Sequence, residues 1–347
     1  MIHVLVIGAG AMGSTHASAY ADMPNAHLAG IVDTDAGKGE RLAAACGTSS
    51  FTSYAEAMAS LDRVDVVDVC LPTPLHKKHV LQAADDGKHV ICEKPLARSL
   101  ADAREMIDRC QSQGVRLFVG HVLRFFHEYT HAKQLLDEGV IGSPAVIRAG
   151  RGGGYPIGWQ HWYSDFRASG GITLDAMIHD FDFLRWCFGE VERVYAKGLH
   201  GRIHAQLDYS LVTLRFQSGV IAHVEGTWSH DGFSMNLEMA GTQGIIGYDS
   251  ARDQPLLSFQ RGGHAGGGGG VPVPESPVEE NPYYQELRHF LNCIEQDEEP
   301  IVTAEDAYEA LRIALSALQS METGRPVHLG AGAGDLSSPD SKGVIGP

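Results

Sequence analysis

The chain has 347 residues, of which 44% are hydrophobic and 20% are charged, and its formal net charge at pH 7 is -16. This length predicts two domains that share a cleft, since single hydrophobic cores rarely grow beyond about 250–300 residues. The composition is typical of a soluble globular protein. The negative charge argues against nucleic acid and anionic membrane surfaces, which select for basic faces, and favours a small neutral substrate.

Targeting and redox signals are absent from the sequence. No apolar run approaches the roughly 20 residues that cross a bilayer, and Met1–Gly8 leads directly into a strand pattern without an export signal. We therefore expect no membrane contact and a location in the cytoplasm. The six cysteines are widely spaced and form no C-x-x-C pair, so packing in a reducing compartment is expected, and no metal.

The first strand and turn predict a dinucleotide site. Ile2–Ile7 is a continuous apolar run, as in a strand buried on both faces of a parallel sheet. It is followed by Gly8-Ala9-Gly10-Ala11-Met12-Gly13 and by helix formers through Tyr20. Strand, glycines and helix in this order allow the backbone to approach a pyrophosphate at the helix N-terminus. The alternative is a glycine turn with no ligand.

The second apolar run, Leu28–Val32, ends in Asp33 and Thr34. A carboxylate at this position accepts hydrogen bonds from a ribose 2′-hydroxyl and repels a 2′-phosphate. We therefore expect NAD rather than NADP as the cofactor, with Asp33 and Thr34 beside the ribose. Lys38 and Arg41 are the residues that could reverse this preference.

Strand and helix patterns then alternate, as in one parallel sheet with right-handed crossovers. The expected strands are Asp65–Cys70, His89–Cys92 and Val115–Val119, and the expected helices are Leu75–Asp86 and Ser99–Gln113.

The loop after the first of these strands, Leu71-Pro72-Thr73-Pro74-Leu75-His76, contains two prolines that stiffen it at the carboxyl edge of the sheet. We expect Leu71, Pro72 and Thr73 to wall the cofactor and His76 to lie near the nicotinamide ribose. In the alternative, His76 only opens the following helix.

The next strand ends in Glu93-Lys94-Pro95. This places a lysine amine outside the carboxyl ends of the strands, where open α/β sheets bind their ligands.

These three motifs, together with His16, resemble the Gfo/Idh/MocA oxidoreductase family over almost the whole chain, to about Leu329. The resemblance implies an α/β protein with an N-terminal Rossmann dinucleotide-binding domain and a C-terminal α+β domain with an open, mostly antiparallel sheet. We place the domains at residues 1–121 and 122–329. The resemblance further implies a cis Lys94-Pro95 bond, a cofactor contact by Glu93 and Lys94, and homodimers or homotetramers formed through the second sheet.

The residues after Val119 begin the expected substrate domain. Arg124 matches the arginine that the family often carries in its substrate wall, and the alternative for it is a salt bridge on a solvated face. A helix is expected over Glu128–Gly139.

The segment Gly152–Gly171 is rich in glycine and aromatic residues. Aromatic faces with polar edges stack against sugar rings, so this segment predicts a mobile loop over the pocket, with Tyr155, His161 and Trp162 as substrate contacts. Alternatively, these aromatic side chains fasten a long loop onto the core.

Apolar residues at helical spacing follow the double glycine Gly170-Gly171, and they place Asp175 and His179 on one helix face, where the two can hydrogen-bond. Both residues also match the second catalytic motif of the family, although Ile172 stands where the family often has a third glycine. Met177-Ile178-His179-Asp180 is similar to the inositol dehydrogenase branch.

The remaining segments complete the second domain. Long antiparallel strands are expected over Leu207–Phe216, Val220–Trp228 and Met235–Gly241, and a mobile loop over Gly262–Pro277. Helices are expected at Pro282–Glu295 and Thr303–Thr323, and the resemblance implies that they pack back on the first domain. The tail Gly330–Pro347 has too little apolar content to fold and is expected to be disordered.

Together these features predict hydride transfer from a ring secondary hydroxyl of a sugar, cyclitol or related polyol to nicotinamide. We assign His179 as general base, Asp175 as the group that orients it and Lys94 as the cation beside the reacting oxygen. Lys94 could instead be the base if burial lowers its pKa. The alternative functions are a redox-neutral, NAD-assisted epimerase or glycoside-cleaving enzyme, and a non-catalytic dinucleotide or sugar sensor.

Overall fold

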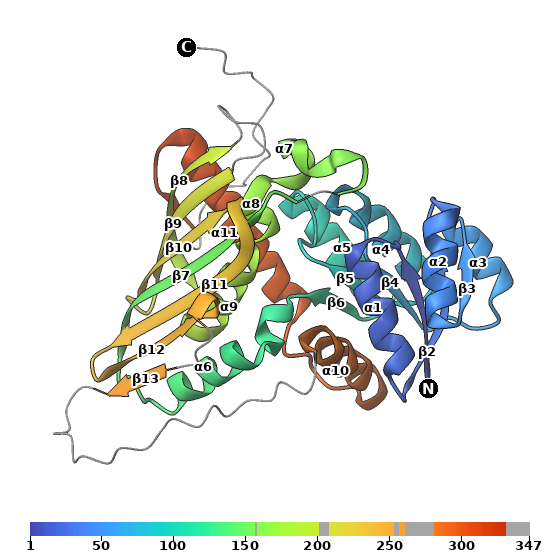
Figure 1. Cartoon of the computed structure of the whole chain (residues 1–347), viewed down its shortest axis with the longest axis horizontal. Helices are drawn as coiled ribbons and strands as arrows, with labels where there is room; N and C mark the ends of the chain where they lie inside the picture. Colours follow the sequence, from blue (N-terminus) through green and yellow to red (C-terminus); the bar gives the residue numbers. More distant parts are fainter. Residues whose placement is uncertain (157, 201–207, 253–256, 261–280, 331–347) are drawn as a thin grey trace, which may run out of the picture.

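The computed structural model describes residues 1–156, 158–200, 208–252, 257–260 and 281–330. Within these ranges the chain forms two β-sheets that stand side by side, with helices between and around them (Figure 1). The mobile loop expected over Gly262–Pro277 and the disordered tail expected beyond Gly330 lie outside the described residues.

The first sheet is parallel and has the strand order β3-β2-β1-β4-β5-β6 within the described chain. Its strands are β1 (Ile2–Ile7), β2 (Ala26–Val32), β3 (Ser49–Phe51), β4 (Val66–Val69), β5 (His89–Glu93) and β6 (Leu117–Gly120). This order places a topological switch point between β1 and β4, and open α/β sheets bind ligands at the carboxyl ends of the strands there.

Helices cover both faces of this sheet, as a Rossmann fold requires. They are α1 (Ala11–Asp22), α2 (Ala36–Cys46), α3 (Tyr54–Ser60), α4 (His76–Asp85) and α5 (Leu100–Ser112). The sequence did not predict α2, α3 or β3. β3 and α3 are short, and only a few residues of the three elements are buried, so their apolar pattern is weak.

The second sheet contains, among the described residues, eight strands in the order β13-β12-β11-β7-β10-β9-β8-β14. The described pairings are antiparallel except β7 with β10, so the expected open and mostly antiparallel sheet is confirmed. Its strands are β7 (Pro144–Gly154), β8 (Val191–His200), β9 (Asp208–Phe216), β10 (Ile221–Thr227), β11 (Ser229–Gly241), β12 (Gly244–Asp249), β13 (Leu257–Gln260) and β14 (Val327–His328).

Strand β7 lies inside this sheet although the sequence placed its glycine-rich end in a mobile loop. Gly150 and Gly152 lie so close to Asn236 and His230 of β11 that added Cβ atoms would approach these side chains to 2.5 and 2.2 Å. The glycines therefore allow neighbouring strands to pair closely, because they carry no side chain at the contact.

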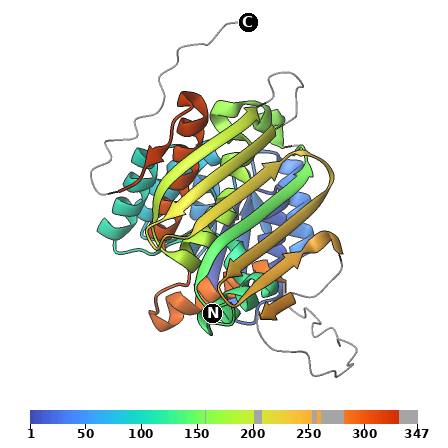
Figure 2. The same ribbon diagram turned by 90° about the vertical axis from the view of Figure 1, so that its left-hand side faces the viewer.

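Helices cover one face of the second sheet and leave the other face open, as Figure 2 shows with the sheet toward the viewer. The main covering helices are α6 (His127–Asp137), α8 (Gly171–Asp175), α9 (Ile178–Phe188) and α11 (Ala304–Thr323). Helix α11 begins with a capping box between Thr303 and Asp306, as its sequence predicts.

Helix α10 (Pro282–Gln296) joins the second half of the chain to the first sheet. Phe290 stacks on Phe118 of β6 with ring centroids 5.0 Å apart. Arg116 donates to the Cys293 and Glu298 carbonyl oxygens at 2.8 and 2.5 Å. The two halves are thereby held so that the carboxyl ends of β1, β4 and β5 face the helices of the second sheet. No helix in the described ranges is long and apolar enough to cross a membrane.

Candidate active site

The glycine turn between β1 and α1 is built for a ligand that approaches the backbone. Gly8 has a φ of +107°, and a Cβ added there would meet the Cys70 carbonyl oxygen at 2.3 Å. A Cβ on Gly13 would meet the Gly8 carbonyl oxygen at 1.8 Å. A Cβ on Gly10 would meet no described atom within 4 Å, and Gly10 caps α1 without a side-chain bond. The protein itself needs Gly8 and Gly13, whereas the space beside Gly10 and the helix N-terminus fits a pyrophosphate.

Asp33 lies at the end of β2 and faces this turn. Its carboxylate accepts hydrogen bonds from the Ala9 amide at 2.7 Å and from the Asp35 amide at 2.8 Å. Asp33 remains half-buried and Thr34 is exposed. The two amides orient the carboxylate beside the glycine turn, where a ribose 2′-hydroxyl would reach it.

Lys94 follows β5 and connects the two halves of the molecule. Its Nζ donates to the Asp175 carbonyl oxygen at 2.7 Å and to Asp175 Oδ1 at 3.3 Å. Its backbone amide donates to Glu93 Oε2 at 3.0 Å, and the Lys94-Pro95 peptide bond is cis, as expected. These contacts fix the ammonium group at the carboxyl edge of the first sheet and beside the helices of the second.

Asp175 and His179 lie in two successive helices rather than in one, which differs from the sequence prediction. Asp175 is the last residue of α8, and α9 begins only at Ile178, so the chain breaks its helical path between the two side chains. The carboxylate of Asp175 pairs with Lys94, and no bond between Asp175 and His179 occurs among the described residues. Asp175 therefore orients Lys94 rather than His179.

His179 lies in the first turn of α9, and its Nδ1 is buried with no hydrogen-bond partner in the described part of the chain. Burial, together with the positive charges of Lys94 and Arg151 and the nearby His121, lowers the pKa of His179 well below its usual value. The imidazole is therefore neutral near pH 7 and able to accept a proton.

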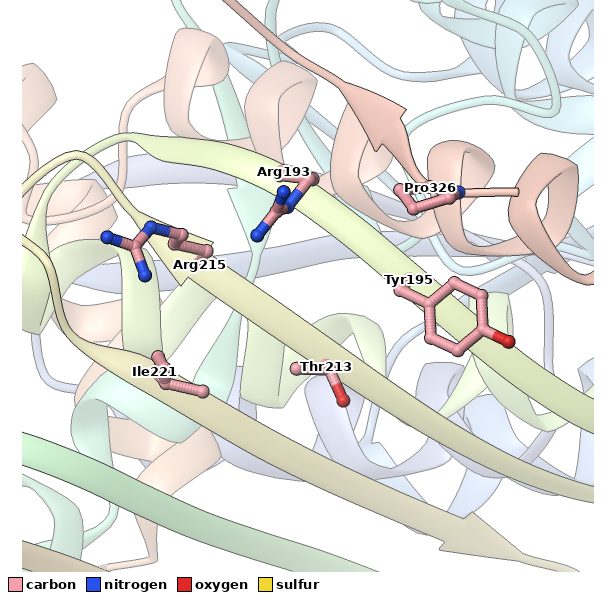
Figure 3. A pocket seen from close by; sticks show the side chains of 6 residues that line it. All are labelled: Arg193, Tyr195, Thr213, Arg215, Ile221 and Pro326. Carbon is pink, nitrogen blue, oxygen red and sulfur yellow. The ribbon is translucent and has the colours of Figure 1, made fainter. Parts of the chain in front are cut away.

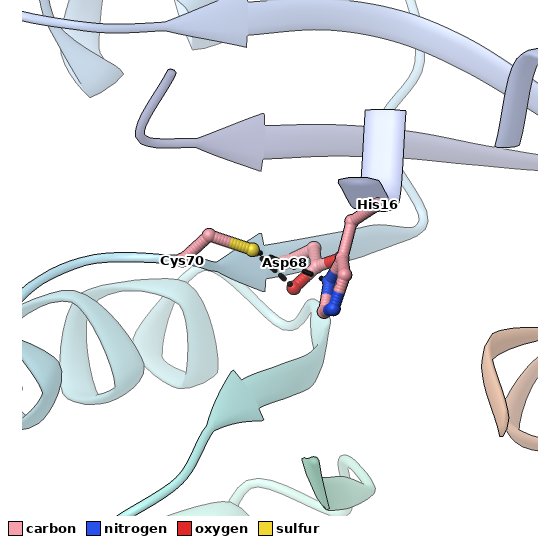
Figure 4. A group of neighbouring side chains, drawn as sticks. All are labelled: His16, Asp68 and Cys70. Atoms are coloured by element: carbon pink, nitrogen blue, oxygen red, sulfur yellow. Dashed lines mark hydrogen bonds and ion pairs between the residues drawn. The ribbon is translucent and has the colours of Figure 1, made fainter. Parts of the chain in front are cut away.

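A buried polar network holds Glu93 behind Lys94. His16 Nδ1 lies 2.8 Å from Asp68 Oδ2 (Figure 4), and His16 Nε2 lies 3.2 Å from Glu93 Oε1. The Tyr20 hydroxyl donates to Asp68 Oδ2 at 2.8 Å. Burial opposes charge on His16, but Cys70 and Asp68 raise the pKa of His16 well above its usual value. His16 in turn outweighs burial at Glu93 and lowers the pKa of that carboxyl.

The same network contains three possible metal ligands. One ligand atom from each of His16, Asp68 and Cys70 lies within 4.8 Å of the others. These atoms already contact one another, and burial and the charge of Asp68 raise the pKa of the Cys70 thiol, which opposes the thiolate that a metal would require. The group is best described as a support for Glu93.

His76 connects the loop that begins at Leu71 to the segment that contains Lys94 and Pro95. Its Nδ1 lies 3.0 Å from the Pro95 carbonyl oxygen, and its Nε2 lies 2.7 Å from the Leu71 carbonyl oxygen. The ring is fully buried at the first position of α4, and burial lowers its pKa. Both ring nitrogens therefore face carbonyl oxygens of the protein, and the neutral ring donates to one of them, which favours the alternative in which His76 opens the helix.

Arg124 lies in the protein interior, where its guanidinium is engaged by other groups of the chain. Its guanidinium forms a two-point ion pair with Asp182, with distances of 2.8 and 2.6 Å. It also donates to the Ile301 carbonyl oxygen at 2.6 Å and packs over Trp186. The salt-bridge alternative fits this placement, although the pair is buried rather than solvated.

The aromatic segment packs together at the second sheet. The Tyr155 hydroxyl donates to the Tyr163 carbonyl oxygen at 3.0 Å, and its ring lies edge-on to Trp228. Trp162 stacks on Tyr163 with centroids 4.2 Å apart, while His161 is exposed and has a φ of +56°. Tyr155 thus fastens the segment to Trp228, whereas Trp162 packs within the segment, and each remains only half-buried.

Three further residues belong to this site, although the sequence analysis did not assign them to it. Arg151 of β7 pairs with Asp180 at 2.9 Å and adds positive charge near His179. Tyr163 lies near enough to Asp175 and Glu93 that burial and these two carboxylates raise the pKa of its hydroxyl. His121 lies 6.0 Å from His179 between ring centroids.

Both halves of the chain match models of one protein family. Residues 2–121 match the family model described as an oxidoreductase family with an NAD-binding Rossmann fold. Residues 133–329 match the model of the C-terminal alpha/beta domain of the same oxidoreductase family.

Similar proteins include two inositol dehydrogenases. A myo-inositol 2-dehydrogenase of Thermotoga maritima is 31% identical over 332 residues, covering 93% of this chain and 97% of that protein. A scyllo-inositol 2-dehydrogenase (NAD(+)) of Bacillus subtilis is 30% identical over 341 residues, covering 94% of this chain and 96% of that protein. The crystal structure of a probable dehydrogenase from Thermotoga maritima matches with a TM-score of 0.79 at 29% identity, covering 94% of this chain and 99% of that one.

The buried position of Arg124 predicts a stability effect. Arg124→Met should lower the free energy of unfolding by about 3–5 kcal/mol, because Asp182 is left as an uncompensated buried charge. Urea unfolding would measure this loss. The double variant Arg124→Met/Asp182→Leu should recover most of it, and Arg148→Met, at an exposed pair with Glu238, should cost no more than about 1 kcal/mol. Unchanged stability of Arg124→Met would contradict the structural role.

Proposed function

The chain belongs to the Gfo/Idh/MocA oxidoreductase family, and we propose that it is an NAD-dependent dehydrogenase acting on a ring secondary hydroxyl of a sugar, cyclitol or related polyol. One observation carries this proposal. Lys94, at the end of the cofactor sheet, is bonded to Asp175, while its charge helps to keep the imidazole of His179 neutral. A fixed cation and a neutral base beside one another are what oxidation of an alcohol requires.

The cofactor contacts follow from the first sheet. The backbone around Gly8, Gly10, Ala11, Met12 and Gly13 would hold the pyrophosphate, and Asp33 would accept hydrogen bonds from the ribose. The rest of the cofactor site would be lined by Leu71, Pro72 and Thr73 and by Glu93 and Lys94. When bound, the oxidised nicotinamide supplies the acceptor for the hydride that leaves the substrate carbon.

The residues of the second domain would act on the substrate oxygen. His179 accepts the hydroxyl proton because its ring is neutral. Lys94 stabilises the negative charge that develops on the oxygen, and Asp175 keeps the ammonium group in place for this task. The Asp175 bond thus replaces the expected Asp175–His179 contact without changing the assignment of base and cation.

The substrate class is supported by several observations. Tyr155 and Trp162 present half-buried aromatic faces near the site, and such faces stack on sugar and cyclitol rings. The inositol dehydrogenases among the relatives favour cyclitols within this class. His161 is exposed on the same segment and is proposed as a further substrate contact.

The open face of the second sheet is proposed as the surface through which copies associate. It exposes Tyr195, Leu199 and Leu211 on adjacent strands, with Leu199 53% exposed. A shallow hollow on β8, β9 and β10 adjoins them and is lined by Arg193, Tyr195, Thr213, Arg215, Ile221 and Pro326 (Figure 3). This hollow is formed by the second sheet, with none of the residues assigned to the cofactor or the base, so it is not the proposed substrate pocket.

Replacement of the base gives a direct test. His179→Asn should lower kcat for polyol oxidation by about 10²–10⁴-fold, because the proton acceptor is lost. NAD binding, measured by quenching of protein fluorescence, should stay unchanged. His127→Asn, at an exposed position of α6, is the matched control and should retain activity. Full turnover by the His179 variant would refute the assignment.

Cofactor preference depends on the charge of Asp33. Asp33→Asn should lower kcat/KM for NAD by about 10–100-fold, since a hydrogen bond to a charged group contributes about 1.5–3 kcal/mol. It should also raise the ratio of NADP to NAD efficiency, because the 2′-phosphate is no longer repelled. Asp35→Asn, at the exposed cap of α2, serves as the control. Parallel assays with NAD and NADP would measure both efficiencies, and an unchanged ratio of NADP to NAD efficiency would count against the role of Asp33.

A further inference from the structure

His121 is a buried histidine next to the proposed base. It directly follows Gly120, the last residue of β6, and its backbone amide donates to the Val119 carbonyl oxygen at 2.8 Å. The side chain is fully buried. Neither ring nitrogen has a hydrogen-bond partner among the residues that the structure describes. Buried polar groups nearly always have partners in native proteins, so two such nitrogens on one ring indicate a functional arrangement.

The ring of His121 faces His179. The two centroids are 6.0 Å apart, and the rings are nearly perpendicular at 82°. His179 Nδ1 is also buried and without a partner in the described chain. Three ring nitrogens without partners therefore lie on two neighbouring rings, and a water that bridges them would satisfy such groups.

The two rings have different charged neighbours, because carboxylates act on His121 but not on His179. Besides burial, the influences on His179 are Lys94, Arg151 and His121, and all of them lower its pKa. Burial also lowers the pKa of His121, but Asp182 of α9 and Glu93 of β5 act in the opposite direction, against Arg124 and Lys94. Nearby carboxylates therefore favour a proton on His121, whereas the charged groups that act on His179 all oppose one.

We propose that His121 is the positioning residue of His179 and receives, through a bridging water, the proton that His179 takes from the substrate. This inference rests on the proposed function, in which His179 is the base. It gives His121 the position that the sequence assigned to Asp175, which is instead engaged by Lys94.

The proton steps balance without a further reactant. The substrate O–H bond breaks as one ring nitrogen of His179 gains a proton. The other ring nitrogen releases its proton to the bridging water, which passes one proton to His121. His179 ends neutral with its tautomer exchanged, and His121 ends as an imidazolium that is stabilised by Asp182 and Glu93.

Chemical rescue tests the relay. His121→Ala should lower kcat by roughly 10–100-fold, at the low end of what proton transfer contributes, and added imidazole should restore turnover in a saturable manner. Pyrazole has nearly the same shape but is a much weaker base, and it should restore none. Equal rescue by both compounds would show that the ring only fills space and would overturn the proposal. His289→Ala, whose ring accepts from the Ile301 amide outside the site, should show no imidazole-dependent gain.

A second measurement does not depend on turnover. Exchange of the imidazole C2 proton, followed by mass spectrometry as a function of pH, gives a titration midpoint for each histidine. In the wild-type chain the midpoint of His121 should lie above that of His179. In His121→Gln, which keeps a polar side chain but cannot carry the charge, the midpoint of His179 should rise. A lower midpoint for His121, or an unmoved His179, would overturn the relay.

The two measurements also separate this inference from the proposed function. A wild-type chain that oxidises no polyol but shows both midpoints as expected would contradict the dehydrogenase and leave the histidine pair standing. A wild-type chain that oxidises polyols but shows equal rescue or unmoved midpoints would contradict the relay alone.

Discussion

The bond between Lys94 and Asp175 is the contact on which the site depends, because it joins the cofactor half of the molecule to the substrate half. Lys94 is held from its own side by Glu93, which accepts its backbone amide, and Glu93 is held in turn by His16 and Asp68. On the other side, Asp175 offers both a carbonyl and a carboxylate oxygen at the end of α8. A chain of partners therefore runs from the interior of the first sheet to the helices of the second and determines where the ammonium group lies.

Buried arginines hold the helix that carries His179. Arg124 and Arg151 pair with Asp182 and Asp180, which occupy the first turns of α9 on either side of Phe181. Removing either partner of such a pair would leave a costly buried charge, so the pairs fix α9 firmly in the core. In these pairs the carboxylates of Asp182 and Asp180 are already bound by the arginines. His179 is left buried beside cations and one other histidine, and its burial, together with these charges, lowers its pKa.

Much of the first domain was predictable from sequence, since local patterns determine it. Ile2–Ile7 is buried on both faces, and the glycines after it obey steric needs that arise within a few residues. The predictions that needed correction concern residues whose partners lie far away in the sequence. The 3.6-residue period predicted an Asp175–His179 pair, but a helix break and a lysine 81 positions away redirect Asp175. Arg124 pairs with Asp182, 58 positions away, and the glycines of β7 serve strand packing that one strand alone does not reveal.

The central claim is that the cleft around Lys94 and His179 carries out net oxidation of a polyol with NAD. Its most direct test is the absorbance of reduced nicotinamide when the purified chain is supplied with NAD and, in turn, with inositols, hexoses and glycosides. The account predicts that reduced nicotinamide accumulates to many equivalents per chain with at least one cyclitol or sugar. Product formation without any accumulation, or no reaction with any polyol despite NAD binding, would contradict it.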